Sequence, residues 1–198
     1  MATGAPPALL VIDMIGLLDF PGADRVAPSA LRAARGVRTL RDRFHRRGWP
    51  VAYVNDNFAR WQSDFRELVA MASASPGPAQ AIAGLLEPTP KDYFVLKPKH
   101  SAFLDTALSV LLAKLGVRRL LLAGMALESC VLATAIDANA REYEVAVVRE
   151  AVAGQPPLRA AAFKVLAGSK AADVVALDRA VAWAARPARR ARPGGVAR

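Results

Sequence analysis

The chain has 198 residues, of which 54% are apolar, and a formal net charge of +10. This length suits one domain with a core that needs no disulfide, and no apolar run approaches the roughly 20 residues of a membrane span. The start has no basic cluster before an apolar stretch, and the single cysteine cannot form an internal disulfide, so we expect a cytoplasmic protein.

Half of the net charge comes from a short tail, residues 186–198, which contains five arginines and no acidic residue. The tail also has prolines and glycines but no aromatic side chain, a composition that predicts disorder. We therefore expect one domain over residues 1–185 followed by a solvated basic tail. The alternative is a weak, salt-sensitive contact of the tail with polyanions. We expect no specific nucleic-acid partner and no membrane partner.

Short apolar runs alternate with longer stretches of helical periodicity, which predicts repeated βαβ units. The predicted strands are Ala8–Ile12, Val51–Val54, Tyr93–Leu96, Arg118–Ala123, Val145–Val148 and Asp173–Leu177. The predicted helices are Ala27–Arg47, Ala79–Leu86, Phe103–Leu115, Ser129–Glu142, Leu158–Ala167 and Asp178–Ala185. Prolines between Asn55 and Tyr93 predict a long, loop-rich crossover there. The predicted fold is α/β, a three-layer α/β/α sandwich around a six-stranded, mainly parallel sheet.

Three reactive side chains follow predicted strands. Asp13 comes after the first strand, Lys97 after the third, and Cys130 just past the fourth, at a helix start. Ligands of open parallel sheets bind at the carboxyl ends of the strands, so the three side chains are expected to converge. Taken singly, they could be a turn residue, a solvated lysine and a small apolar side chain. Together they favour a nucleophilic thiol, kept ionised by Lys97 and the helix dipole, with Asp13 as its base.

Four segments give the chain a family resemblance. They are Leu-Val-Ile-Asp-Met at 10–14, Tyr-Val-Asn-Asp-Asn-Phe at 53–58, Lys-Pro-Lys-His-Ser-Ala-Phe at 97–103, and Gly-Met-Ala-Leu-Glu-Ser-Cys-Val at 124–131, continuing to Thr134. At these positions the chain resembles the isochorismatase-like cysteine hydrolases. The resemblance implies Asp13, Lys97 and Cys130 as catalytic residues. It selects Lys97 because the family lysine stands four residues before the Ser-Ala-Phe triplet.

The resemblance also implies a cis peptide bond between Met125 and Ala126, with the N–H groups of Ala126 and Cys130 forming an oxyanion hole. Phe58, Trp61 and His100 are expected to line the substrate pocket. The alternatives are core burial for an aromatic residue and a surface role for the histidine.

Two departures from the family pattern limit the resemblance. Apolar residues 15–18 follow Asp13, where many relatives have polar residues and an aromatic. The loop after the second strand lacks the histidines through which nicotinamidases bind a metal, so we predict no metal and no other cofactor, and nicotinamide is disfavoured as substrate. We expect residues 55–57 to form a turn closed by side-chain hydrogen bonds.

The predicted activity is cysteine-dependent hydrolysis of a small amide, ureide or carbamoyl compound through a thioester. One alternative is vinyl-ether hydrolysis as in isochorismatase, which needs an acid but no thiol. Another is a non-catalytic binding module of the same fold. Relatives often form oligomers, so a homo-oligomer is expected, with a small molecule as the only other partner.

Overall fold

The computed structural model describes residues 5–57 and 62–186 and is built around one six-stranded sheet. Adjacent strands are all parallel and follow the order β3-β2-β1-β4-β5-β6. The strands are β1 (Pro7–Ile12), β2 (Val51–Asp56), β3 (Tyr93–Lys97), β4 (Arg119–Gly124), β5 (Glu144–Val152) and β6 (Asp173–Val175). The predicted parallel α/β fold is therefore confirmed.

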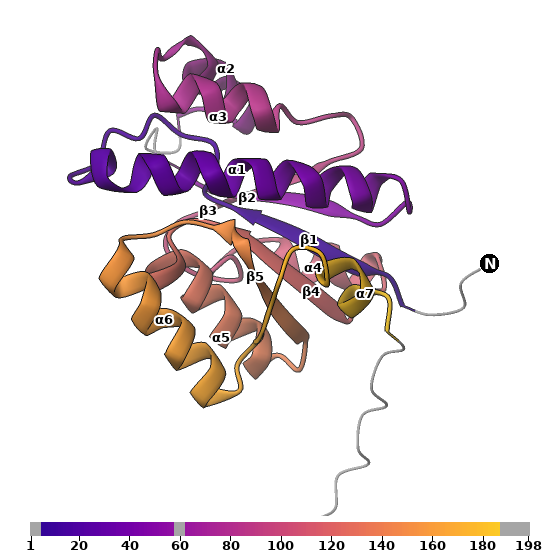
Figure 1. Ribbon diagram of the computed structural model, residues 1–198. Helices are drawn as coiled ribbons and strands as arrows, with labels where there is room; N and C mark the ends of the chain where they lie inside the picture. The colour runs from indigo at the N-terminus through magenta and orange to yellow at the C-terminus, as the bar shows by residue number, and fades with distance from the viewer. Residues whose placement is uncertain (1–4, 58–61, 187–198) are drawn as a thin grey trace, which may run out of the picture.

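Helices cover both faces of the sheet, as Figure 1 shows. One side has α1 (Ala23–His45), α2 (Phe65–Ala74) and α3 (Pro78–Leu86), and α7 (Ala180–Ala184) contributes to the same core. The other side has α4 (Leu108–Lys114), α5 (Leu132–Ala140) and α6 (Pro156–Ser169). Alternate residues of β1 enter opposite cores, which explains why this strand is apolar throughout. The three predicted layers are present.

Helix bounds show the main errors of the sequence prediction. The helix expected from Phe103 begins at Leu108, because residues 101–107 form turns and Asp105 has a left-handed backbone conformation. Helix α2 was not predicted at all. Its N-terminus has a complete capping box in which Asp64 and Glu67 each accept from the other's backbone N–H. That pattern is visible in the sequence and could have revealed the helix.

The carboxyl ends of β1 and β4 lie side by side next to the point where strand order reverses. Gly124 ends β4 with φ +118°, and a Cβ there would lie 2.0 Å from the carbonyl oxygen of Ile12. The next N–H group, that of Met125, donates to this same oxygen at 2.9 Å. Only glycine permits this close approach, so the chain leaving β4 begins its next helix beside the end of β1.

Within the described ranges, every helix is too short or too polar to span a bilayer.

Candidate active site

Asp13 stands directly after β1, where two strands hold it. Its φ of 49° is left-handed, a conformation that aspartate tolerates better than most residues. Its N–H donates to the carbonyl of Val54, and its Oδ1 accepts from the N–H of Asp56 at 2.7 Å. The side chain is buried. The ends of β1 and β2 thus fix the carboxyl group before any ligand binds.

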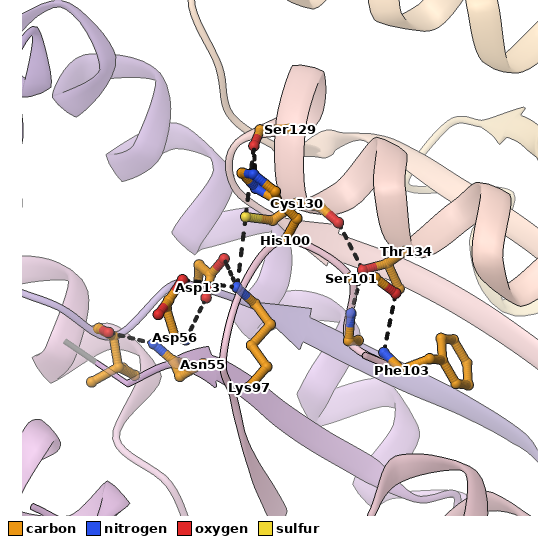
Figure 2. A network of polar contacts seen from close by, with 12 residues as sticks. Asp13, Asn55, Asp56, Lys97, His100, Ser101, Phe103, Ser129, Cys130 and Thr134 are labelled. Atoms are coloured by element: carbon orange, nitrogen blue, oxygen red, sulfur yellow. Dashed lines mark hydrogen bonds and ion pairs between the residues drawn. The ribbon is translucent and has the colours of Figure 1, made fainter. Parts of the chain in front are cut away.

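Lys97 ends β3 and brings the site together. Its side chain is fully buried, and its Nζ lies 2.9 Å from Oδ2 of Asp13 and 3.6 Å from Sγ of Cys130. Figure 2 shows the three side chains pointing toward one another from different elements. The predicted convergence of Asp13, Lys97 and Cys130 is therefore present.

Asp56 is a fourth member of this cluster, and the sequence prediction missed it. Its Oδ2 lies 3.3 Å from Nζ of Lys97. The turn predicted at residues 55–57 is wrong, because Asn55 and Asp56 are the last two residues of β2. The place of Asp56 at a strand end next to β1 was a usable signal. A buried ammonium needs partners to offset its desolvation, and Asp13 and Asp56 together supply them.

Cys130 lies in the π-helical turn η1 (Leu127–Val131), which continues directly into α5. The predicted helix start at Ser129 is thus two residues late, and Cys130 is in the first turn, partly exposed. The peptide bond between Met125 and Ala126 is cis, as expected. The carbonyl of Ala126 accepts from the N–H groups of Ser129 and Val131. The oxyanion-hole role of the Ala126 and Cys130 N–H groups remains a prediction.

Burial dominates the protonation of the cluster. It raises the pKa of Asp13, although Lys97 and a hydrogen bond with Cys130 oppose the shift. Burial, followed by the charge of Asp13, raises the pKa of Cys130 to about 12. Burial lowers the pKa of Lys97, but the charges of Asp13 and Cys130 outweigh it, and the net pKa is raised. These directions favour a charged Lys97 and a protonated Cys130 in the resting site. The thiolate expected from the sequence stays a prediction.

The loop after β3 is tied to the nucleophile's helix by two hydroxyl groups. Thr134 Oγ1 donates to the carbonyl of Cys130 at 2.7 Å and accepts from the N–H of Ala102 at 3.0 Å. Ser101 Oγ donates to Oδ2 of Asp137 at 2.7 Å. These bonds explain part of the Lys-x-x-x-Ser-Ala-Phe and Cys-x-x-x-Thr patterns, to which sequence reasoning assigned no structural role.

Of the three predicted pocket residues, only His100 is described. It is exposed, and its Nδ1 lies 3.2 Å from Oγ of Ser129, the neighbour of Cys130. Phe58 and Trp61 lie outside the described residues. His100 is therefore next to the nucleophile, and its contact with substrate remains a prediction.

The described part of the chain contains no group of three or more His, Cys, Asp or Glu side chains placed to hold a metal ion. The carboxylate best placed for such a role, Asp56, is paired with Lys97. That the protein uses no metal remains a prediction.

Comparison with known proteins identifies the family. The Isochorismatase domain model matches residues 7–178. The chain is 34% identical to the isochorismatase family protein YaaI of Bacillus subtilis, covering 75% of this chain and 81% of that protein. It is 31% identical to maleamate amidohydrolase of Pseudomonas putida, covering 75% and 73%. N-carbamoylsarcosine amidase from Thermoplasma acidophilum superposes with a TM-score of 0.68 at 28% identity, covering 87% and 97%. The chain belongs to the isochorismatase family.

Proposed function

We propose that this protein is a hydrolase of C–N bonds that cleaves a small amide, ureide or carbamoyl compound with Cys130 as nucleophile. The observation that carries the proposal is the contact of one buried ammonium, Lys97 Nζ, with both Asp13 (2.9 Å) and the Cys130 sulfur (3.6 Å). An acid, a cation and a thiol at one sheet edge suit nucleophilic catalysis. The names of the relatives agree, since they include a maleamate amidohydrolase, ureidoacrylate amidohydrolases and an N-carbamoylsarcosine amidase.

The first half of the reaction forms a thioester. Asp13 removes the thiol proton as the Cys130 sulfur attacks the carbonyl carbon, and the carbonyl π electrons move onto oxygen. The N–H groups of Ala126 and Cys130 stabilise this oxyanion. Asp13 then returns the proton to the departing nitrogen as the C–N bond breaks. Lys97 remains charged throughout and stabilises whichever of its two anionic neighbours carries the negative charge.

The second half regenerates the enzyme. Asp13 takes a proton from water as the water oxygen attacks the thioester carbon. The second tetrahedral intermediate expels the Cys130 sulfur, which recovers its proton, and the products are a carboxylic acid or carbamic acid and an amine or ammonia. A thiol with a raised pKa suits this cycle because the nucleophile is generated only when Asp13 accepts its proton.

Two other functions remain to be separated from this one. Vinyl-ether hydrolysis needs an acid such as Asp13 but no thiol. A non-catalytic module would have an unreactive Cys130. The contact of Lys97 with both Asp13 and the Cys130 sulfur favours the thiol-dependent amidase.

The decisive experiment is a screen of small amides, ureides and carbamoyl compounds for release of ammonia or amine, with Cys130→Ala as the paired variant. We expect Cys130→Ala to lower turnover by at least about a thousandfold, as loss of a covalent nucleophile does in other hydrolases. Intact-protein mass spectrometry under substrate should reveal an acyl adduct on the wild-type chain only.

Circular dichroism of Cys130→Ala serves as the folding control. Full turnover by this variant on any compound in the screen would refute the thiol mechanism, and on a vinyl ether it would establish the alternative chemistry. A wild-type thiol that fails to react with iodoacetamide would support the binding module.

A further inference from the structure

We propose that Ser129 and His100 are positioning residues for the Cys130 sulfur. The Ser129 hydroxyl donates a hydrogen bond to this sulfur, to which Lys97 also donates from a different element. The proposal rests on the function proposed above and adds two residues to it. His100 acts only through Ser129, and Ser129 acts on the sulfur.

The three groups form a chain of contacts from solvent to the nucleophile. Oγ of Ser129 lies 3.8 Å from Sγ of Cys130 and 3.2 Å from Nδ1 of His100. Figure 2 shows the His100 ring next to Ser129 and Cys130. Ser129 belongs to η1 and is partly buried, whereas His100 comes from the loop after β3. Two separate segments therefore meet at this hydroxyl.

The number of available protons fixes which group donates in each of these contacts. Once Asp13 has taken the proton of the Cys130 thiol, the sulfur carries none and can only accept hydrogen bonds. In the contact with Ser129 the sulfur must therefore accept, and the single hydroxyl proton of Ser129 must point at it. The hydroxyl then has no proton left for His100, so Nδ1 of His100 carries a hydrogen and donates to Oγ. Assigned this way, both contacts of the Ser129 hydroxyl are satisfied at once.

The consequence is greatest when the sulfur gains negative charge. Hydrogen bonds to ionised acceptors are roughly twice as strong as those between neutral groups. As Asp13 removes the thiol proton, the Ser129 hydroxyl stabilises the developing thiolate, and the His100 N–H prevents that hydroxyl from rotating away. The Lys97 ammonium acts on the same sulfur from the end of β3.

The backbone at His100 supports a positioning role. Its φ of 38° is left-handed, which is uncommon for a residue other than glycine. The neighbouring Ser101 and Ala102 are bonded to Asp137 and Thr134 of α5, so the loop is held against the helix that carries the nucleophile. The ring is thus presented to Ser129 by a braced loop.

The test measures the rate at which iodoacetamide alkylates Cys130 in the full-length protein at pH 7.5, which requires no knowledge of the substrate. We expect Ser129→Ala to slow alkylation about tenfold, as loss of a hydrogen bond to a charged group does, and His100→Ala to slow it about threefold. Ser169→Ala is the matched control. Among the described residues its hydroxyl bonds only backbone groups, at the end of α6, and its rate should equal that of the wild type.

Two further variants separate positioning from general damage. His100→Asn places an amide N–H near the position of Nδ1 and suits a left-handed backbone, so it should restore most of the wild-type rate. In the double variant, His100→Ala should add nothing to Ser129→Ala, because His100 acts through the hydroxyl that is already absent. Thermal unfolding of each variant reports whether it is folded.

Equal alkylation rates for Ser129→Ala and the wild type would overturn the inference, as would additive losses in the double variant or failure of His100→Asn to rescue. These results leave the proposed function intact provided that wild-type Cys130 is alkylated and Cys130→Ala is inactive. Failure of either of those two conditions would instead refute the proposed function.

Discussion

In the proposed mechanism one proton passes from Cys130 to Asp13, and this shapes how the thiol should react. Because the pKa of Cys130 is raised to about 12, a free thiolate is scarce at neutral pH. In the proposed mechanism, reaction in that range proceeds from the thiol with ionised Asp13 as base. Burial raises the pKa of Asp13. As pH falls, Asp13 therefore takes up a proton, and stops acting as a base, at a higher pH than an ordinary aspartate would.

The expected pH profile of Cys130 alkylation follows from these directions. From low pH the rate should rise as Asp13 loses its proton, stay level through the neutral range, and rise again only at alkaline pH as free thiolate forms. Asp13→Asn should have no level region and should gain about tenfold per pH unit, because only thiolate reacts. Stopped reactions with iodoacetamide between pH 5 and 9.5 measure both profiles. A wild-type rate proportional to hydroxide throughout would contradict a basic role for Asp13.

At the scale of elements, the site depends on how the loop after β3 is joined to the helix formed by η1 and α5. Thr134 is fully buried and makes two of the joining bonds, accepting from Ala102 and donating to the Cys130 carbonyl. A buried N–H that loses its acceptor bears its whole desolvation cost. These two bonds form a brace between the loop and the helix. The brace therefore matters for stability and for the relative position of Lys97 and Cys130.

Thr134→Val tests this brace without a large change in volume. We expect a loss of about 1–3 kcal/mol in the free energy of unfolding, from chemical denaturation followed by circular dichroism, together with slower Cys130 alkylation. Thr39→Val is the matched control. Thr39 makes the same bond to the carbonyl four residues earlier, that of Arg35 in α1, but it is partly exposed, and no N–H of the described residues donates to it. Its variant should change stability by less than about 0.5 kcal/mol.

At the scale of the whole molecule, the proposed hydrolase activity does not explain why half of the net charge of +10 lies in residues 186–198. Residues 187–198 lie outside the described residues and contain four of the five tail arginines. The fifth, Arg186, has its guanidinium 5.6 Å from the ring centroid of Trp183. The prediction that the tail is merely solvated stands, with a weak, salt-sensitive contact with polyanions as its alternative.

A chain truncated after Arg186 should test this proposal, since it keeps the contact with Trp183. We expect the truncated chain to elute from heparin at lower salt than the full chain, because fewer counterions are released on binding. Its Cys130 alkylation rate should be unchanged. Retention that survives truncation would place the polyanion contact on the folded domain instead.

Local pattern determined much of this protein. Apolar runs predicted all six strands, and their alternation with helical stretches predicted the three layers, since a parallel sheet needs apolar residues on both faces and helices over each. The motifs around Asp13, Lys97 and Cys130 identified the residues that converge, because the ends of parallel strands share one edge. Helix α2 was missed although its capping box is local.

Only the tertiary structure decided the state of the site. The sequence suggested an ionised thiol, but ionisation depends on how deeply the sulfur is buried and on which charges surround it. Asp56 joins Lys97 only because β2 and β3 are adjacent, and Ser129 meets His100 only because the loop after β3 lies against η1. Such contacts between segments distant in sequence arise from packing, which no local pattern records.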